Sequence, residues 1–223
     1  MKNHLRLGLL ALAAILVLAS CGNSGGGSQG NADGPQKAAG GMAGMDHDQM
    51  GHGPEGMGSK GMARQMVMEN GKYSDERFID AIVPHHQGAI HMARVALENA
   101  EHEEIVQLSE NIVSTQQAEI GELKSIKQEE FGISRVPMEM SQQQMRGMGV
   151  MMDPQELANQ EPFDKAFIDA MIPHHQSAIE MALVAREKSK NPQIKELAEN
   201  IISAQQTEIE QMKQWREQWY PED

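Results

Sequence analysis

Paired histidines and nearby methionines recur in this chain at spacings that could bind a metal ion. The tetrapeptide Pro-His-His-Gln occurs at residues 84–87 and again at 173–176, each time with a methionine six residues after the second histidine. Imidazole and thioether groups are neutral, soft donors that favour Cu(I) and need no cysteine. The candidate metal ligands are therefore His85, His86, Met92, His174, His175 and Met181.

These residues belong to a longer internal repeat. Residues 78–96 return at 167–185 after a shift of 89 residues, with fourteen of nineteen positions identical. The same shift aligns residues 105–124 with 194–213, where eleven of twenty positions match. One unit of two segments was therefore duplicated whole, and its role should involve the groups that both copies keep.

Each copy is predicted to be a helical hairpin. Apolar residues recur at helical spacing after Ser74, which can cap a helix, and Asn191 with Pro192 marks the break between the two helices of the second copy. A single hairpin leaves an apolar face uncovered, so the two copies should pack as one four-helix bundle of the all-α class. The expected ranges are 63–131 for the first hairpin, 132–161 for a methionine-rich connector and 162–223 for the second hairpin.

The same helical spacing predicts where the histidines lie. His85 and His174 fall inside the apolar stripe of their helices, whereas His86 and His175 fall on its border. A buried imidazole needs a hydrogen-bond partner or a metal ion, because its desolvation is otherwise uncompensated. One alternative is thus that the histidines only bond to polar residues of the second helices and fix the register of the bundle. The candidate partners are Gln116, Glu119, Gln205 and Glu208.

Many of the 18 methionines lie where core packing does not account for them. Residues 21–62 are rich in glycine and nearly free of branched apolar residues, which predicts a flexible tether. Methionine is a common core filler, so Met92 and Met181 alone would indicate packing. The polar tether and the connector nevertheless hold further candidate ligands, namely Met42, Met45, His47, Met50 and His52 in the tether and Met145, Met148, Met151 and Met152 in the connector.

The first twenty residues are typical of a secretion signal. Lys2 and Arg6 precede an apolar run that is too short to span a bilayer. Residues 18–21, Leu-Ala-Ser-Cys, resemble a bacterial lipobox, so Cys21 is expected to carry a lipid that anchors the protein to a membrane of the cell envelope, outside the cytoplasm. The alternative is an ordinary signal peptide with an incidental cysteine.

Charge and cysteine content exclude several kinds of function. The chain carries 19 basic and 32 acidic residues, a net charge of −13, which disfavours nucleic acid as a partner. Cys21 is the only cysteine, so the mature fold has no intramolecular disulfide, zinc-thiolate site or cysteine nucleophile.

The motif around each histidine pair resembles the family known as domain of unknown function 305. Its signature is similar to F-[IL]-D-x-M-[IV]-P-H-H-x-x-A-I-x-M-A followed by a Q-x-x-E-I helix, and it occurs here twice. The resemblance implies a ferritin-like four-helix bundle and, as for some members, copper binding and copper tolerance in the bacterial envelope. It also implies Met171 as a further ligand, whereas Ile82 replaces the corresponding methionine of the first copy. The residues that would orient the ligands are Asp80, Gln116, Glu119, Asp169, Gln205 and Glu208.

These observations favour an envelope-anchored protein that binds Cu(I) through methionine and histidine, with Cu(II) and Ag(I) as other ions that it would accept. It would buffer copper, confer tolerance or pass the ion to a copper-handling partner, and no catalytic step is implied. The main alternative is a non-catalytic structural or interaction bundle with hydrogen-bonded core histidines. A ferritin-like di-metal oxidase is a minor alternative, because such centres use Glu-x-x-His motifs and none occurs in the sequence.

Overall fold

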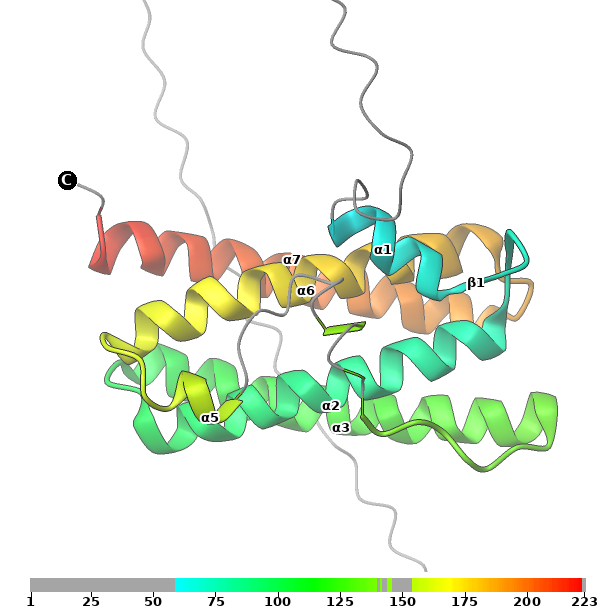
Figure 1. The fold of residues 1–223 in the computed structure, drawn as a ribbon, viewed down its shortest axis with the longest axis horizontal. Coiled ribbons are helices and arrows are strands. Elements are labelled where there is room, and N and C mark those ends of the chain that lie inside the picture. The colour runs from blue at the N-terminus through cyan, green and yellow to red at the C-terminus, as the bar shows by residue number, and fades with distance from the viewer. Residues whose placement is uncertain (1–58, 140, 142–143, 146–153, 222–223) are drawn as a thin grey trace, which may run out of the picture. The chain divides into compact units, whose positions relative to one another are not determined.

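The computed structural model describes residues 59–139, 141, 144–145 and 154–221, and four long helices dominate them (Figure 1). These are α2 (Asp75–Asn99), α3 (Glu103–Phe131), α6 (Phe163–Lys188) and α7 (Pro192–Trp219). Shorter elements are α1 (Ser59–Met66), β1 (Met68–Glu69), β2 (Lys72–Tyr73) and α5 (Pro154–Leu157). The all-α fold class is confirmed, since the strands pair only over two residues each.

The helix boundaries follow from the capping residues. The Ser74 side chain accepts a hydrogen bond from the Arg77 amide at 3.3 Å, and α2 begins with two acidic residues that suit a helix N-terminus. The Asn191 side chain accepts from the amides of Gln193 and Ile194 at 2.9 and 3.4 Å, and Pro192 occupies the first turn of α7. In the first hairpin, α3 ends at Phe131, and the next residue, Gly132, has a φ of 66°, in the left-handed region that glycine adopts without strain.

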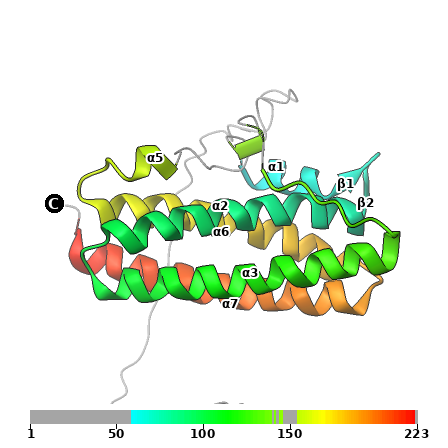
Figure 2. The ribbon, with the colours of Figure 1, turned by 90° about the horizontal axis from the view of Figure 1, so that it is seen from below.

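The long helices form two antiparallel hairpins that pack side by side. α2 packs along α3, and α6 packs along α7. Figure 2 shows α2 beside α6 in one layer and α3 beside α7 in the other, so the first helices of the two copies meet face to face. The core between the layers consists of apolar side chains that are fully buried, among them Phe78, Ile112, Leu123, Phe167 and Ile201. Each contributes about 1.5–3 kcal/mol by leaving water.

The chain before α2 is more ordered than its composition predicts. The expected tether ended at residue 62, yet α1 already begins at Ser59 and packs on α6. Ala63 and Val67 are fully buried there, and Arg64 Nε lies 2.8 Å from Glu180 Oε2. Glycine-rich sequence gives a weak helical signal, and contact with α6 stabilises the helix instead.

Several predicted segments lie outside the described residues. These are the signal peptide 1–20, Cys21, the five candidate ligands of the tether, and Met148, Met151 and Met152 of the connector. Met145 is described and is partly buried. None of the helices in the described ranges is long and apolar enough to cross a membrane.

Candidate metal centre

The first histidines of the two repeats meet in the core, where α2 faces α6. The rings of His85 and His174 lie with centroids 3.8 Å apart and planes tilted by 43°, and the two residues are 1 % and 2 % exposed. His85 Nε2 lies 2.7 Å from Ser177 Oγ of the opposite hairpin. The equivalent residue of the first copy is Gly88, where an added Cβ would lie 3.3 Å from His174 Nε2. Each ring thus lies against the same repeat position of the opposite hairpin.

Burial keeps both of these histidines neutral. Desolvation lowers the pKa of His85 well below its usual value, and the neighbouring His174, His86 and His175 lower it further, against a smaller opposing contribution from the His174 backbone. The pKa of His174 is likewise lowered, first by burial and then by His175 and His86. Neutral imidazole is the form that binds metal ions, so both rings are in the ligand-competent state at neutral pH.

The second histidine of each pair faces the second helix of its own hairpin. His175 Nε2 lies 2.6 Å from Glu208 Oε2 on α7 and forms a hydrogen bond with it. His86 Nε2 lies 2.8 Å from Glu119 Oε2 on α3, which is within ion-pair distance, although the pair lacks the direction of a hydrogen bond.

The predicted border position of these second histidines is wrong. His86 and His175 are both 0 % exposed. The apolar stripe of the first helix does not show what its neighbours cover, and Glu119 on α3 and Glu208 on α7 lie against this side of the two helices.

Buried polar atoms without a hydrogen-bond partner concentrate around these histidines. Seven of the ten such side-chain atoms in the described residues belong to the four histidines and two glutamines of the repeat. Leaving such a group unpaired costs about 1–3 kcal/mol, which a bound ion would offset. The donor chemistry therefore fits a metal ion at this place. The atoms are Nδ1 of His85, His86, His174 and His175, Nε2 of His86, and Oε1 of Gln116 and Gln205.

The predicted methionine ligands are also buried in this bundle. Met92 is 2 % exposed, and Met171 and Met181 are 0 % exposed, all within the same apolar core. Among the described residues, no three His, Cys, Asp or Glu side chains converge closely enough to hold an ion by themselves. A complete ligand set here would therefore have to combine imidazole nitrogens with thioether or amide groups.

Two predicted supporting residues lie elsewhere. Asp80 Oδ1 contacts Lys127 Nζ at 2.5 Å, and Asp169 is bound by Arg216 Nε at 2.9 Å and by Lys165 Nζ at 2.6 Å. Asp80 precedes His85 by five residues, which rotates it by about 140° around the helix, away from the histidine face. The role of the two aspartates in orienting the histidines is therefore corrected to ion pairing between the helices of each hairpin.

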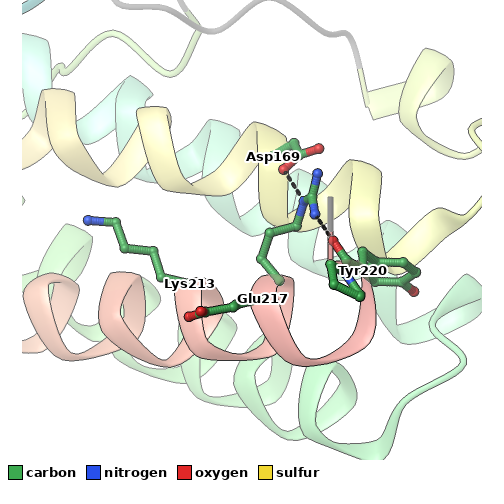
Figure 3. Close-up of a pocket in the computed structure, with 6 residues that line it drawn as sticks. Asp169, Lys213, Glu217 and Tyr220 are labelled. Atoms are coloured by element: carbon green, nitrogen blue, oxygen red, sulfur yellow. Dashed lines mark hydrogen bonds and ion pairs between the residues drawn. The ribbon is translucent and has the colours of Figure 1, made fainter. Parts of the chain in front are cut away.

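The surface near one of these aspartates is hollowed. Figure 3 shows this cleft beside the end of α7, lined by Asp169 and Tyr220. Its volume is about 530 Å³, and Arg216 donates hydrogen bonds both to Asp169 and to the backbone carbonyl of Tyr220. Lys213 and Glu217 line it as well, so its walls carry both signs of charge. It holds none of the predicted histidine or methionine ligands.

Sequence reasoning missed a second polar cluster, at the end of the bundle. Asp164, fully buried at the start of α6, accepts hydrogen bonds from the His102 amide at 2.8 Å and from the Glu101 amide at 3.1 Å, and its Oδ2 lies 2.6 Å from His102 Nδ1. The His102 ring stacks on Trp219 with a centroid distance of 3.8 Å and an interplanar angle of 7°. This cluster joins the turn of one hairpin to both helices of the other. Its only sequence signal is an acidic residue in the first turn of each repeat.

Comparisons with known proteins agree with the repeat and the fold. The family described as Domain of unknown function (DUF305) matches residues 27–127 and 127–216. The chain is 40% identical to CopM in its Cu(I)-bound form over 67% of this chain and 99% of that one, with a TM-score of 0.59. CopM in its Cu(II)-bound form is 41% identical over 66% and 99%, with a TM-score of 0.61, and CopM has also been solved with silver bound.

Two further relatives match a smaller share of this chain. A DUF305 fragment from Deinococcus radiodurans is 24% identical over 62% of this chain and 92% of that one, with a TM-score of 0.55, which shows the fold. The uncharacterized protein L153 of Acanthamoeba polyphaga mimivirus is 47% identical over 49 residues, 22% of this chain. The match spans about a third of that relative, 32% of its length.

Proposed function

We propose, from the premise that this chain is a member of the DUF305 family, that it binds copper through buried histidines and methionines. The likeness to CopM, solved with Cu(I), Cu(II) and silver, supports a copper-related function in general. The observation that carries the finer proposal is the set of buried ring nitrogens without a hydrogen-bond partner, on histidines that both repeats supply.

Cu(I) is the favoured ion because the candidate donors, imidazole nitrogens and thioether sulfurs of the two hairpins, are uncharged and soft. Imidazole nitrogens and thioether sulfurs stabilise Cu(I), and Ag(I) has the same preference. Glu119 and Glu208 stand next to His86 and His175, so Cu(II), which accepts nitrogen and oxygen ligands, would also be tolerated. The residues that would hold the ion are His85, His86, His174 and His175 with Met92, Met171 and Met181.

The wider role is that of a carrier or buffer. In this proposal a lipid at Cys21 anchors the chain in the bacterial envelope, and the methionines and histidines of residues 42–52 serve as accessory ligands. The protein would hold copper for tolerance or hand it to a partner, without catalysing a reaction. Its negative charge suits cations as partners and disfavours nucleic acid.

The test is a competition titration with Cu(I) against a coloured cuprous chelator, without oxygen. A variant with His174→Gln, His175→Gln and Met181→Leu should lose the tightly held ion. The matched control is His91→Gln, an exposed histidine on α2 that is hydrogen bonded to Gln87 at 3.2 Å and should bind copper like the parent. Undiminished binding in the triple variant would place the copper outside the bundle core, and a parent protein that retained no copper would end the proposal.

A second candidate function is a structural bundle without a ligand. It is favoured by the hydrogen bonds of His175 to Glu208 at 2.6 Å and of His85 to Ser177 at 2.7 Å, which already satisfy one nitrogen of each ring. Under this alternative, the triple variant lowers the free energy of unfolding but leaves copper retention unchanged. The titration and a denaturation curve on the same samples separate the two functions.

A further inference from the structure

The hydrogen bonds around Ser177 determine which nitrogen of His85 carries the proton. Ser177 Oγ lies 2.8 Å from the backbone carbonyl of His174, an oxygen that can only accept, so the hydroxyl proton is donated there. The same Oγ lies 2.7 Å from His85 Nε2 and has only its lone pairs left for that contact. With the hydroxyl proton on that carbonyl, His85 Nε2 is the donor of the second hydrogen bond. A neutral imidazole has one N–H, so Nδ1 of His85 carries a free lone pair.

The same reasoning applies to His175 through a different partner. Glu208 Oε2 lies 2.6 Å from His175 Nε2, and a carboxylate can only accept. His175 therefore donates from Nε2, and Nδ1 carries a free lone pair whenever the ring has a single N–H. Nδ1 of both His85 and His175 is buried and has no hydrogen-bond partner.

The other two histidines lack these restraints. Gly88 stands where a serine would face His174, and a glycine has no hydroxyl to accept from the ring. His86 lies close to Glu119 but without the direction of a hydrogen bond. At the first histidine position of the motif, a partner therefore sets the proton position of His85 but not of His174. At the second position, a partner sets it for His175 but not for His86.

We propose that Ser177 and Glu208 are positioning residues that hold the proton on Nε2 of His85 and His175, so that Nδ1 of each ring is the atom that binds the metal ion. The inference rests on the proposed function and adds the ligand atoms and the residues that select them. Coordination at Nδ1 breaks no existing hydrogen bond, whereas coordination at Nε2 would displace Ser177 or Glu208. A carboxylate that holds the far nitrogen of a ligand histidine also raises its basicity as a ligand.

The proton positions can be tested without metal by nitrogen-15 NMR of the chain labelled at histidine. Two-bond and three-bond correlations to the ring protons distinguish a protonated, pyrrole-type nitrogen from a bare, imine-type one. We expect imine-type Nδ1 and pyrrole-type Nε2 for His85 and His175. Ser177→Ala should leave His85 as a mixture of tautomers, and Ser203→Ala, at an exposed serine on α7, should change neither ring. An imine-type Nε2 in the parent protein would overturn the proposal.

The ligand atoms can be tested with silver nitrate as the probe, because silver has nuclear spin one-half and splits the signal of a bonded nitrogen-15. The splitting is expected on Nδ1 of His85 and His175, and splitting on Nε2 overturns the inference while leaving metal binding in place. If the protein retains no silver or copper, the coordinating role falls with the proposed function, and the metal-free spectra still decide the proton positions by themselves.

Affinity supplies an independent measure of the positioning role. Loss of a residue that orients a metal-binding histidine typically weakens affinity about 10–100-fold. Glu208→Gln should therefore weaken silver binding by about that factor, and Glu119→Gln, whose carboxylate makes no hydrogen bond to its histidine, by clearly less. Equal losses in the two variants would contradict the assignment of Glu208.

Discussion

Metal-free protein should lose stability steeply in mild acid because two core histidines resist protonation. Burial lowers the pKa of both His85 and His174 well below the usual 6.5, so the folded state leaves these rings neutral where the unfolded chain binds protons. The unfolded state then gains protons as the pH falls through about 6.5, and stability falls with it. If neither folded ring is protonated above pH 5, the loss between pH 7 and pH 5 is about 2 kcal/mol per ring, or about 4 kcal/mol for the pair.

The assay is urea denaturation at both pH values in the presence of a copper chelator. The parent protein is compared with a His85→Gln/His174→Gln variant, and the pH dependence should be smaller in the variant by about 4 kcal/mol. Ring NMR signals of the parent provide a second measurement that does not require the variant to fold: both histidines should keep neutral-imidazole shifts down to pH 5. Rings that become protonated near pH 6.5, or an unchanged pH dependence in a folded variant, would refute the reasoning.

Three further outcomes follow from the structure. Asp164→Ala removes a fully buried acceptor from two partly buried amides and should lower the free energy of unfolding by about 2–4 kcal/mol. Asp169→Ala, in an exposed ion pair on the same helix, should cost less than about 1 kcal/mol, and equal effects of the two variants in urea denaturation would contradict this. Alanine in place of glycine usually stabilises a helix by about 1 kcal/mol. In thermal unfolding, Gly121→Ala on α3, with open space around its Cβ, should show this gain, whereas Gly88→Ala should not, because its Cβ would press on His174. Silver at about 100 times its dissociation constant should add about 2.7 kcal/mol of stability, and an unchanged melting temperature would indicate that the ion does not bind the folded state.

The hairpins could be predicted from the sequence because their signals are local. Helical periodicity, the Ser74 cap and the Asn191–Pro192 break all act within a few residues, and the structure reproduces them. The duplication predicts how the hairpins pack, because two similar amphipathic hairpins have few ways to bury their apolar faces except against each other. The burial of His85 and His174 followed from the same periodicity.

The details of the centre could not be predicted because they depend on how the two hairpins are set against each other. No sequence rule places Ser177 opposite His85, since that contact depends on the relative position of α2 and α6. The ion pair of Asp80 with Lys127 depends in the same way on the register of α2 against α3. Periodicity along one helix also says nothing about what the neighbouring helix covers. It therefore predicts that His86 lies on the border of the apolar stripe, whereas the residue is fully buried.

The two copies differ at positions 88 and 177, a glycine and a serine that each face the first histidine of the opposite hairpin. If a serine stood at both 88 and 177, each first histidine could donate to the opposite helix and the centre would be symmetric. Glycine at position 88 instead gives the His174 ring a close approach to α2 with no hydroxyl to bind, while His85 keeps its partner. The centroids of the His85 and His174 rings already lie 3.8 Å apart, so an ion placed between them would have to push the rings apart. The glutamates of the second helices lie instead beside the second histidine of each pair, with Glu119 Oε2 at 2.8 Å from His86 Nε2 and Glu208 Oε2 at 2.6 Å from His175 Nε2. The duplication has therefore placed unlike neighbours against equivalent histidines, Ser177 against His85 but Gly88 against His174.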